Sequence, residues 1–135
     1  MEVRTQIILR LLTSNYVVAQ FPPSWRPDTV HWHNKGVVSL TITPDEWSLI
    51  CAEEEVPSGG VLERGWRLFE FVGPFAFNET GILSVVLSPL AKAGISIMAF
   101  STYNTDYLMV KAENLTECVQ VFDKTEFIML ELPSE

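Results

Sequence analysis

Cysteine is scarce in this sequence of 135 residues, which contains Cys51 and Cys118 and no others. Two cysteines are too few for the disulfide framework that stabilises many small secreted domains. A cytoplasmic protein with reduced thiols is therefore the expectation. One disulfide between the two residues stays open as the alternative.

Basic side chains are also few. The sequence has 9 Lys and Arg residues against 17 Asp and Glu residues, which gives a net charge of −8. A chain this acidic repels phosphate backbones, and its basic residues are scattered along the sequence. Nucleic acid is therefore not expected as a partner.

A long hydrophobic run is missing as well. A membrane-spanning helix needs about 20 largely apolar residues. The longest stretch without a charged side chain, residues 11–25, is interrupted by Pro22 and Pro23. The apolar run near the N-terminus contains Arg10, so it does not have the core of a signal peptide. We therefore expect no membrane segment and no membrane partner.

Motifs for catalysis and cofactor binding are absent too. The sequence has no G-x-x-x-x-G-K or G-x-G-x-x-G loop, and no serine or cysteine in a recognisable nucleophile setting beside a histidine. His31 and His33 offer two imidazoles at a spacing that metals use, but no third ligand follows nearby. The sequence therefore predicts a protein that is not an enzyme and has no cofactor and no metal.

What the sequence does contain is a weak internal repeat at an offset of 60 residues. Residues 8–12 align with 68–72, residues 37–41 with 97–101, and residues 46–53 with 106–113, all without a gap. Acidic, aromatic and apolar residues align with residues of the same kind, which indicates a duplicated supersecondary unit. Chance similarity between amphipathic strands is the alternative.

The second unit, residues 61–135, has the pattern of a ferredoxin-like βαββαβ arrangement. Its predicted elements are a strand at 66–72, a helix from Asn78 to about Ala93, strands at 95–101 and 106–111, a helix after Asn114 and a strand at 127–130. Asn78 and Asn114 are suitable N-caps, and Gly94 stands where a left-handed residue ends a helix. Pro89 should bend the first helix.

Both predicted helices carry one apolar stripe, which is typical of a helix that packs on a sheet. The stripes are Leu83, Val86, Leu87 and Leu90 in the first helix, and Leu115, Cys118, Val119 and Phe122 in the second.

The first unit, residues 1–60, is degenerate and poor in helices. Strands are predicted at 7–12, 36–43 and 46–54. Three prolines exclude a regular helix between residues 20 and 27. We therefore expect an α+β fold in which a complete βαββαβ unit is paired with a helix-poor first unit, and in which both units share one core.

Three segments of the second unit resemble the ACT domain, a small βαββαβ module that binds amino acids and regulates enzymes. The segments are Phe77-Asn78-Glu79-Thr80-Gly81-Ile82-Leu83, residues 90–97 and residues 101–110. The pattern is similar to that of tandem ACT proteins related to aspartate kinase regulatory domains and to eukaryotic cytosolic arginine sensors. Residues 43–49 are the most legible part of a degenerate first ACT-like unit. The resemblance implies an allosteric regulatory protein that forms a homodimer or another homo-oligomer.

The loop before the first helix is the predicted ligand site. A helix N-terminus offers unpaired N–H groups and partial positive charge to a carboxylate, and Gly81, expected in the first turn, allows close approach to the backbone. Glu79 and Asp106 would accept hydrogen bonds from an ammonium group, which favours a basic or polar amino acid. By the resemblance, the ligand-binding residues are Asn78, Glu79, Thr80, Gly81, Ile82, Asn104, Thr105 and Asp106.

Each main residue of this site also has a purely structural interpretation. Asn78 caps a helix, and Glu79 near a helix N-terminus is favoured by the helix dipole. Gly81 permits close helix–strand contact, and Asp106 can satisfy backbone groups of a turn. Their expected convergence at one end of a sheet is what favours ligand binding.

A non-catalytic regulatory protein that binds a free amino acid is therefore the predicted function. The alternative is a protein–protein interaction or oligomerisation module with a vestigial pocket, in which an exposed strand edge binds another copy or a metabolic enzyme. A third class, an acylphosphatase-like hydrolase, would need an arginine within residues 73–82 to hold phosphate, and that segment has none.

Overall fold

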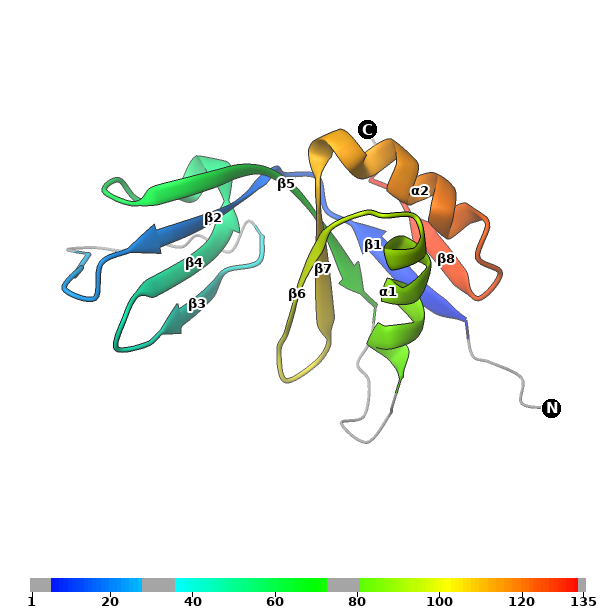
Figure 1. The fold of residues 1–135 in the computed structure, drawn as a ribbon, viewed down its shortest axis with the longest axis horizontal. Helices are drawn as coiled ribbons and strands as arrows, with labels where there is room; N and C mark the ends of the chain where they lie inside the picture. The colour runs from blue at the N-terminus through cyan, green and yellow to red at the C-terminus, as the bar shows by residue number, and fades with distance from the viewer. Residues whose placement is uncertain (1–5, 28–35, 73–80, 134–135) are drawn as a thin grey trace. The chain divides into compact units, whose positions relative to one another are not determined.

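The computed structural model describes residues 6–27, 36–72 and 81–133 (Figure 1). The strands are β1 (Ile7–Leu11), β2 (Tyr16–Phe21), β3 (Ser39–Ile42), β4 (Trp47–Ala52), β5 (Val61–Phe71), β6 (Ile97–Ser101), β7 (Asp106–Lys111) and β8 (Ile128–Glu131). The helices are α1 (Ile82–Lys92) and α2 (Leu115–Asp123), with the short 3₁₀ turns η1 (Glu53–Glu55) and η2 (Ala112–Asn114). The chain forms two compact units, and β5 supplies residues to both.

The unit that contains α1 and α2 has the predicted ferredoxin-like βαββαβ order, β5-α1-β6-β7-α2-β8. Its sheet has the strand order β6-β7-β5-β1-β8. The helices cover one face of this sheet, where their stripes contribute Val86, Leu90, Cys118 and Phe122 to a buried core (Figure 1). The core is completed from the strands by Ile7, Leu9, Leu11, Phe69, Phe71, Leu108, Val110 and Ile128. The α+β fold predicted from the apolar stripes is confirmed.

Strand β1 was assigned to the first repeat by the sequence pattern, but it pairs inside the helical unit. It runs antiparallel to β5, with Leu9 opposite Phe71, and parallel to β8, with Ile7 opposite Ile128. The alternation of buried and exposed residues identifies a strand but not the sheet to which it belongs. The unit thus has five strands where the βαββαβ pattern alone has four.

Helix α1 begins later than the predicted cap. It starts at Ile82, and Gly81 precedes it in the left-handed conformation, with a φ of 81°. Gly81 therefore lies before the first turn rather than in it, and the expected N-cap Asn78 lies outside the described residues. The helix continues through Pro89 to Lys92.

The end of α1 confirms the predicted role of Gly94, which has a φ of 76°. Its N–H donates to the carbonyl of Ala91 at 3.0 Å, and the N–H of Ile95 donates to the carbonyl of Leu90 at 3.0 Å. This pair of bonds is the Schellman motif, which satisfies carbonyl groups at a helix end. Leu90 and Ile95 are both buried, so the motif also anchors the helix to the core.

Helix α2 begins directly after Asn114, as expected, but the side chain of Asn114 makes no capping hydrogen bond. The short 3₁₀ turn η2 leads into the helix instead. The predicted position is confirmed, and the predicted side-chain cap is wrong.

The second compact unit, residues 14–66, is an antiparallel sheet with the order β3-β4-β2-β5. No α-helix occurs in its described residues, 14–27 and 36–66. Strand β2 was not predicted, and Pro22 and Trp25 follow it in a tight turn closed by a 2.9 Å backbone hydrogen bond. Trp25 stacks on Phe21 at a ring-centroid distance of 3.8 Å and helps to cover the buried residues of this unit.

The compact units divide the chain at residues 13 and 66, whereas the predicted repeat boundary lies at residue 60. The assignment of residues 1–60 and 61–135 to two repeats stays a prediction, as does their shared core. In the described part of the chain, neither helix has the length and hydrophobicity that a membrane span requires.

Candidate functional site

A pocket of about 780 Å³ lies between α1 and the turn that joins β6 to β7. Its volume falls in the range of about 300–1,000 Å³ that is usual for small-molecule sites. The residues that line it are Gly81, Ile82, Leu83, Ser84, Leu87, Ser88 and Ala91 from the helix, and Ser101, Thr102, Tyr103, Asn104, Thr105 and Asp106 from the turn.

The N-terminus of α1 forms one end of the pocket. The N–H of Val85 donates to the carbonyl of Gly81 at 2.9 Å, which is the first bond of the helical ladder. The amides of Ile82, Leu83 and Ser84 precede that bond and so have no acceptor within the helix. Gly81 provides no side-chain cap. Amides in this position attract a carboxylate.

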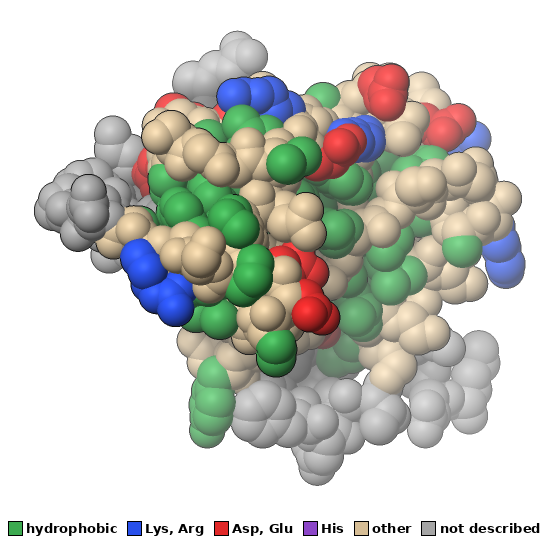
Figure 2. Space-filling model, turned by 60° about the vertical axis from the view of Figure 1, so that its left-hand side comes forward, with side chains coloured by type: hydrophobic (Ala, Val, Ile, Leu, Met, Phe, Trp, Pro, Cys, Tyr) green, Lys and Arg blue, Asp and Glu red, His purple; other side chains and the backbone are tan. Residues whose placement is uncertain are grey.

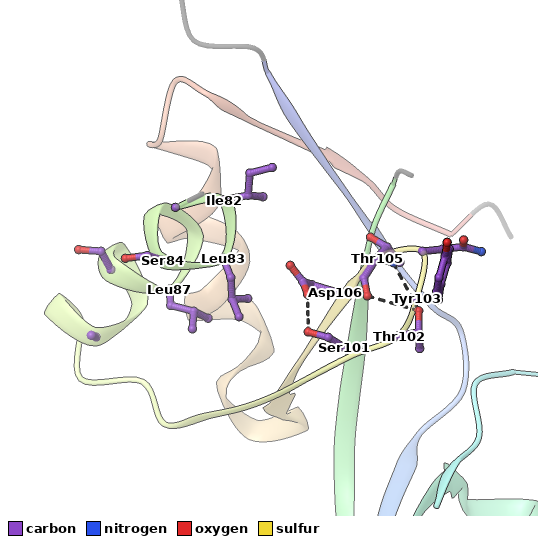
Figure 3. A pocket seen from close by; sticks show the side chains of 13 residues that line it. Ile82, Leu83, Ser84, Leu87, Ser101, Thr102, Tyr103, Thr105 and Asp106 are labelled. Carbon is purple, nitrogen blue, oxygen red and sulfur yellow. Dashed lines mark hydrogen bonds between the residues drawn. The ribbon is translucent and has the colours of Figure 1, made fainter. Parts of the chain in front are cut away.

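The rest of the helical wall is apolar with a hydroxyl rim. Leu83 and Leu87 are half-buried and, in Figure 3, point from α1 toward the side of the pocket where Asp106 and Ser101 lie. Ser84 and Ser88 lie one residue further on, at the exposed edge. The lining extends to Ala91, about 13 Å along the helix from its start.

The opposite wall is a tight turn between β6 and β7. The N–H of Thr102 donates to the carbonyl of Thr105 at 2.8 Å, which closes a two-residue turn at Tyr103 and Asn104. The turn joins the two strands that the sequence predicted at 95–101 and 106–111. Tyr103 at its tip is 81% exposed. The hairpin thus lines the pocket with residues that carry hydroxyl or amide side chains.

Asp106 is the only carboxylate among the described residues that line the pocket. It is half-buried and is the last residue of the β6–β7 ladder, opposite Ser101. The hydroxyl of Ser101 donates a hydrogen bond to Asp106 Oδ1 (Figure 3). Because one oxygen is held in this way, the other is oriented and available to a ligand donor.

The predicted site residues divide into two groups. Gly81, Ile82, Asn104, Thr105 and Asp106 line the same pocket. Asn78, Glu79 and Thr80 lie outside the described residues. Binding of a ligand by any of them stays a prediction.

The sequence interpretation missed the long helical wall of the pocket. Leu83 and Leu87 had been assigned to packing on the sheet. The serines that follow them were given no role in a site. The i, i+4 spacing of Ser84 and Ser88 beside Leu83 and Leu87 is a pattern that could have identified a half-polar helix face.

The two cysteines form no competing site in the described structure. Cys51 and Cys118 are free and fully buried, so the disulfide that the sequence left open does not form. Burial, with a smaller contribution from Glu55 and Glu54, raises the pKa of the Cys51 thiol to about 11, and burial raises the pKa of Cys118 to about 12. Neither thiol is therefore a ready nucleophile at neutral pH.

Metal ligands do not cluster in the part of the chain that is described. No group of three or more His, Cys, Asp or Glu residues is placed to hold an ion there. His31 and His33 lie outside the described residues.

A model of the ACT domain family matches residues 61–124. The match begins at the first residue of β5 and ends just after α2, so it includes the whole of α1, the β6–β7 hairpin and the pocket between them.

Among curated proteins, this chain is similar to cytosolic arginine sensor for mTORC1 subunit 1. The protein from Bos taurus is 30% identical over 108 residues, which are 72% of this chain and 33% of the relative. The Homo sapiens protein is 32% identical with the same coverage of both chains. The chain therefore spans about a third of the length of these relatives.

Among solved structures, protein Atu0741 from Agobacterium tumefaciens is similar over nearly its full length. It is 34% identical, the alignment covers 98% of this chain and 97% of that one, and the TM-score is 0.84. Aspartate kinase from Clostridium acetobutylicum has a TM-score of 0.59 at 13% identity, with 81% of this chain and 32% of that one covered. This second likeness shows a shared fold. Residues 61–124 of this chain therefore belong to the ACT domain family.

Proposed function

We propose that this protein is a non-catalytic regulatory protein that binds a free amino acid in the pocket between α1 and the β6–β7 turn. The observation that supports this most is that the first amides of α1, which have no acceptor within the helix, and Asp106, the one carboxylate among the described lining residues, converge on one cavity of about 780 Å³. A free amino acid carries one carboxylate and one ammonium group a few ångströms apart, so it matches both features.

The α-carboxylate is proposed to accept hydrogen bonds from the amides of Ile82 and Leu83, where the helix dipole favours a negative charge. The α-ammonium is proposed to donate to Asp106, whose carboxylate is oriented by Ser101. The carbonyl groups of the turn can accept its remaining protons. Each charge of the zwitterion then has a partner.

A regulatory role is supported by the family. The similar Bos taurus protein is by name a cytosolic arginine sensor, and the ACT match covers the pocket. The same name supports a cytoplasmic location.

Thermal unfolding with each proteinogenic amino acid in turn tests the proposal. A ligand at about a hundred times its Kd adds about 2.7 kcal/mol to the free energy of unfolding, which raises Tm by about 5–10 °C. The control is the Asp106→Lys variant, in which the shift should disappear. If none of the amino acids raises Tm at millimolar concentration, the proposal is wrong.

The alternative function, an interaction or oligomerisation module, is favoured by a different observation. Within the described residues β3, β6 and β8 each pair with one strand only, so each has an open edge. Hydrophobic side chains also reach the surface between polar ones (Figure 2). The large exposed ones include Ile42, Val61, Met98, Met129 and Leu132. Another copy of the chain or a metabolic enzyme is the proposed partner.

Light scattering over a wide concentration range separates the two functions. An interaction module should change its mass with concentration and show no amino-acid-dependent Tm shift. A sensor should show the shift whether or not it self-associates. A strictly monomeric protein would contradict self-association.

A further inference from the structure

We infer that the pocket selects an amino acid with an uncharged side chain, aliphatic or hydroxyl-bearing, and disfavours arginine, lysine, aspartate and glutamate. This inference rests on the proposed function and narrows its ligand class. It follows from where the charge lies in the lining of the pocket, and it departs from the cationic ligand in the name of the similar arginine sensors.

The first step is a count of charges. Among the described lining residues Asp106 carries the single negative charge, and none carries a positive charge. The zwitterionic part of any amino acid uses this charge for its ammonium group and the helix amides for its carboxylate. Among the described lining residues, a second cation in the side chain then finds no further carboxylate, and a second anion lies near Asp106 without a cation to offset it.

The second step is where the side chain goes. With the carboxylate at the N-terminus of α1, the remaining room runs along the helix past Leu83 and Leu87 to Ala91. This part of the pocket offers methyl groups and the hydroxyls of Ser84 and Ser88. An aliphatic side chain buries apolar surface there, which favours its binding. A terminal hydroxyl finds a hydrogen-bond partner.

A cationic side chain in the same place loses part of its hydration and, from the described lining residues, gains only neutral acceptors. A charged group that is partly desolvated without an opposite charge is disfavoured. A charge-assisted hydrogen bond contributes about 10- to 150-fold in affinity, which is the contribution that lysine or arginine would lack here.

Pairs of ligands with closely similar shape and different charge test the inference directly. Norleucine has the four side-chain carbons of lysine with a hydrogen in place of the ammonium group, and citrulline has a urea in place of the guanidinium group of arginine. Calorimetric titration of the full chain should show norleucine binding at least about tenfold more tightly than lysine, and citrulline more tightly than arginine. Leucine, isoleucine, methionine and threonine are the natural ligands to titrate beside them.

The possible results separate this inference from the proposed function. If lysine or arginine binds more tightly than its neutral counterpart, the charge argument is overturned and the amino-acid sensor stands. That result would be expected if Glu79, which lies outside the described residues, supplies a second carboxylate. If no amino acid of either kind binds, the proposed function itself falls.

A gain-of-function variant gives an independent test. Ser88→Glu places a carboxylate at the exposed edge of the helical wall, and it should reverse the preference so that lysine binds more tightly than norleucine. The matched control is Gln120→Glu, which adds the same charge at an exposed position of α2 away from the pocket lining. The control should keep the original order. An unchanged order in Ser88→Glu would contradict the placement of the ligand side chain along α1.

Discussion

The hydroxyl of Thr105 donates a 2.6 Å hydrogen bond to the carbonyl oxygen of Phe71, the last residue of β5. Thr105 belongs to the β6–β7 turn, so this bond fixes one wall of the pocket to the central part of the sheet. Phe71 is fully buried, so a hydrogen bond to its carbonyl stabilises the fold. The position of the turn is therefore set by the sheet and not by the turn alone.

Thr105→Val should lower the free energy of unfolding by about 1–3 kcal/mol, because the valine has the same shape but leaves the carbonyl of Phe71 without its donor. Urea denaturation measures this difference. Thr105→Ser, which keeps the hydroxyl, is the control and should recover most of the stability. Equal stability of the valine variant and the unchanged protein would mean that water replaces the bond at no cost.

Asp106→Asn should weaken ligand binding by about 10- to 150-fold while the fold stays intact, because the amide keeps the shape and one acceptor but loses the charge that pairs with an ammonium group. Calorimetric titration measures the Kd. Ser101→Ala is the comparison: it removes the hydrogen bond to Asp106 and leaves the carboxylate, so its effect should be smaller. Similar losses in both variants would mean that orientation, and not charge, dominates.

The loss of stability on replacing Gly81 should come from its backbone conformation and not from steric clashes of the new side chain. Its φ is 81°, and a Cβ atom added there meets no atom of the described residues within 4 Å, its chain neighbours aside. Gly81→Ala should therefore cost about 1–2 kcal/mol from the left-handed conformation alone. Gly81→Asn should cost less and Gly81→Val more, because asparagine tolerates this region and β-branched residues do not. Equal costs for all three, by urea denaturation, would show that the loop rearranges.

From the raised pKa values of the two thiols we expect the free energy of unfolding to fall at high pH. Both folded-state pKa values, about 11 for Cys51 and about 12 for Cys118, lie above the ordinary value of 9.0. The neutral thiol is thus favoured in the folded state, and this contribution is complete below pH 9 and declines as the pH rises toward 11 and 12. Unfolding measured from neutral to alkaline pH should show the decline, and Cys118→Ala should make it shallower than in the unchanged protein. An identical pH profile for the variant would contradict the raised pKa of Cys118.

Local patterns predicted the helical unit well. The stripes of α1 and α2 and the left-handed Gly94 follow from spacing along one helix, which the sequence records directly. The start of α1 was predicted from Asn78 as a capping residue. The helix begins after Gly81 instead, because a left-handed glycine can end a loop without any side-chain cap.

Features that depend on distant pairing were not predictable. Strand β2 was missed because, in the repeat, its segment aligns with the start of a predicted helix of the second unit and is followed by prolines. The place of β1 between β5 and β8 cannot be predicted from a short stretch of sequence, because it depends on residues far apart in the chain. The pocket shows the same limit. Thr105 and Asp106 were expected near Gly81, but the extent of the pocket to Ala91 depends on how β7 pairs with β5 and on how α1 packs over the sheet.

The position of β1 has a consequence for synthesis on the ribosome. Arg10 in β1 and Glu131 in β8 are 121 residues apart in the chain and neighbours in the sheet. Strand β1 is synthesised long before β8, and the sheet of the helical unit cannot be completed until β8 has been synthesised. Contacts of such long range slow folding, and a fragment that starts at β5 would have a gap in the middle of its sheet. A binding experiment on residues 61–135 alone would therefore examine an incomplete molecule.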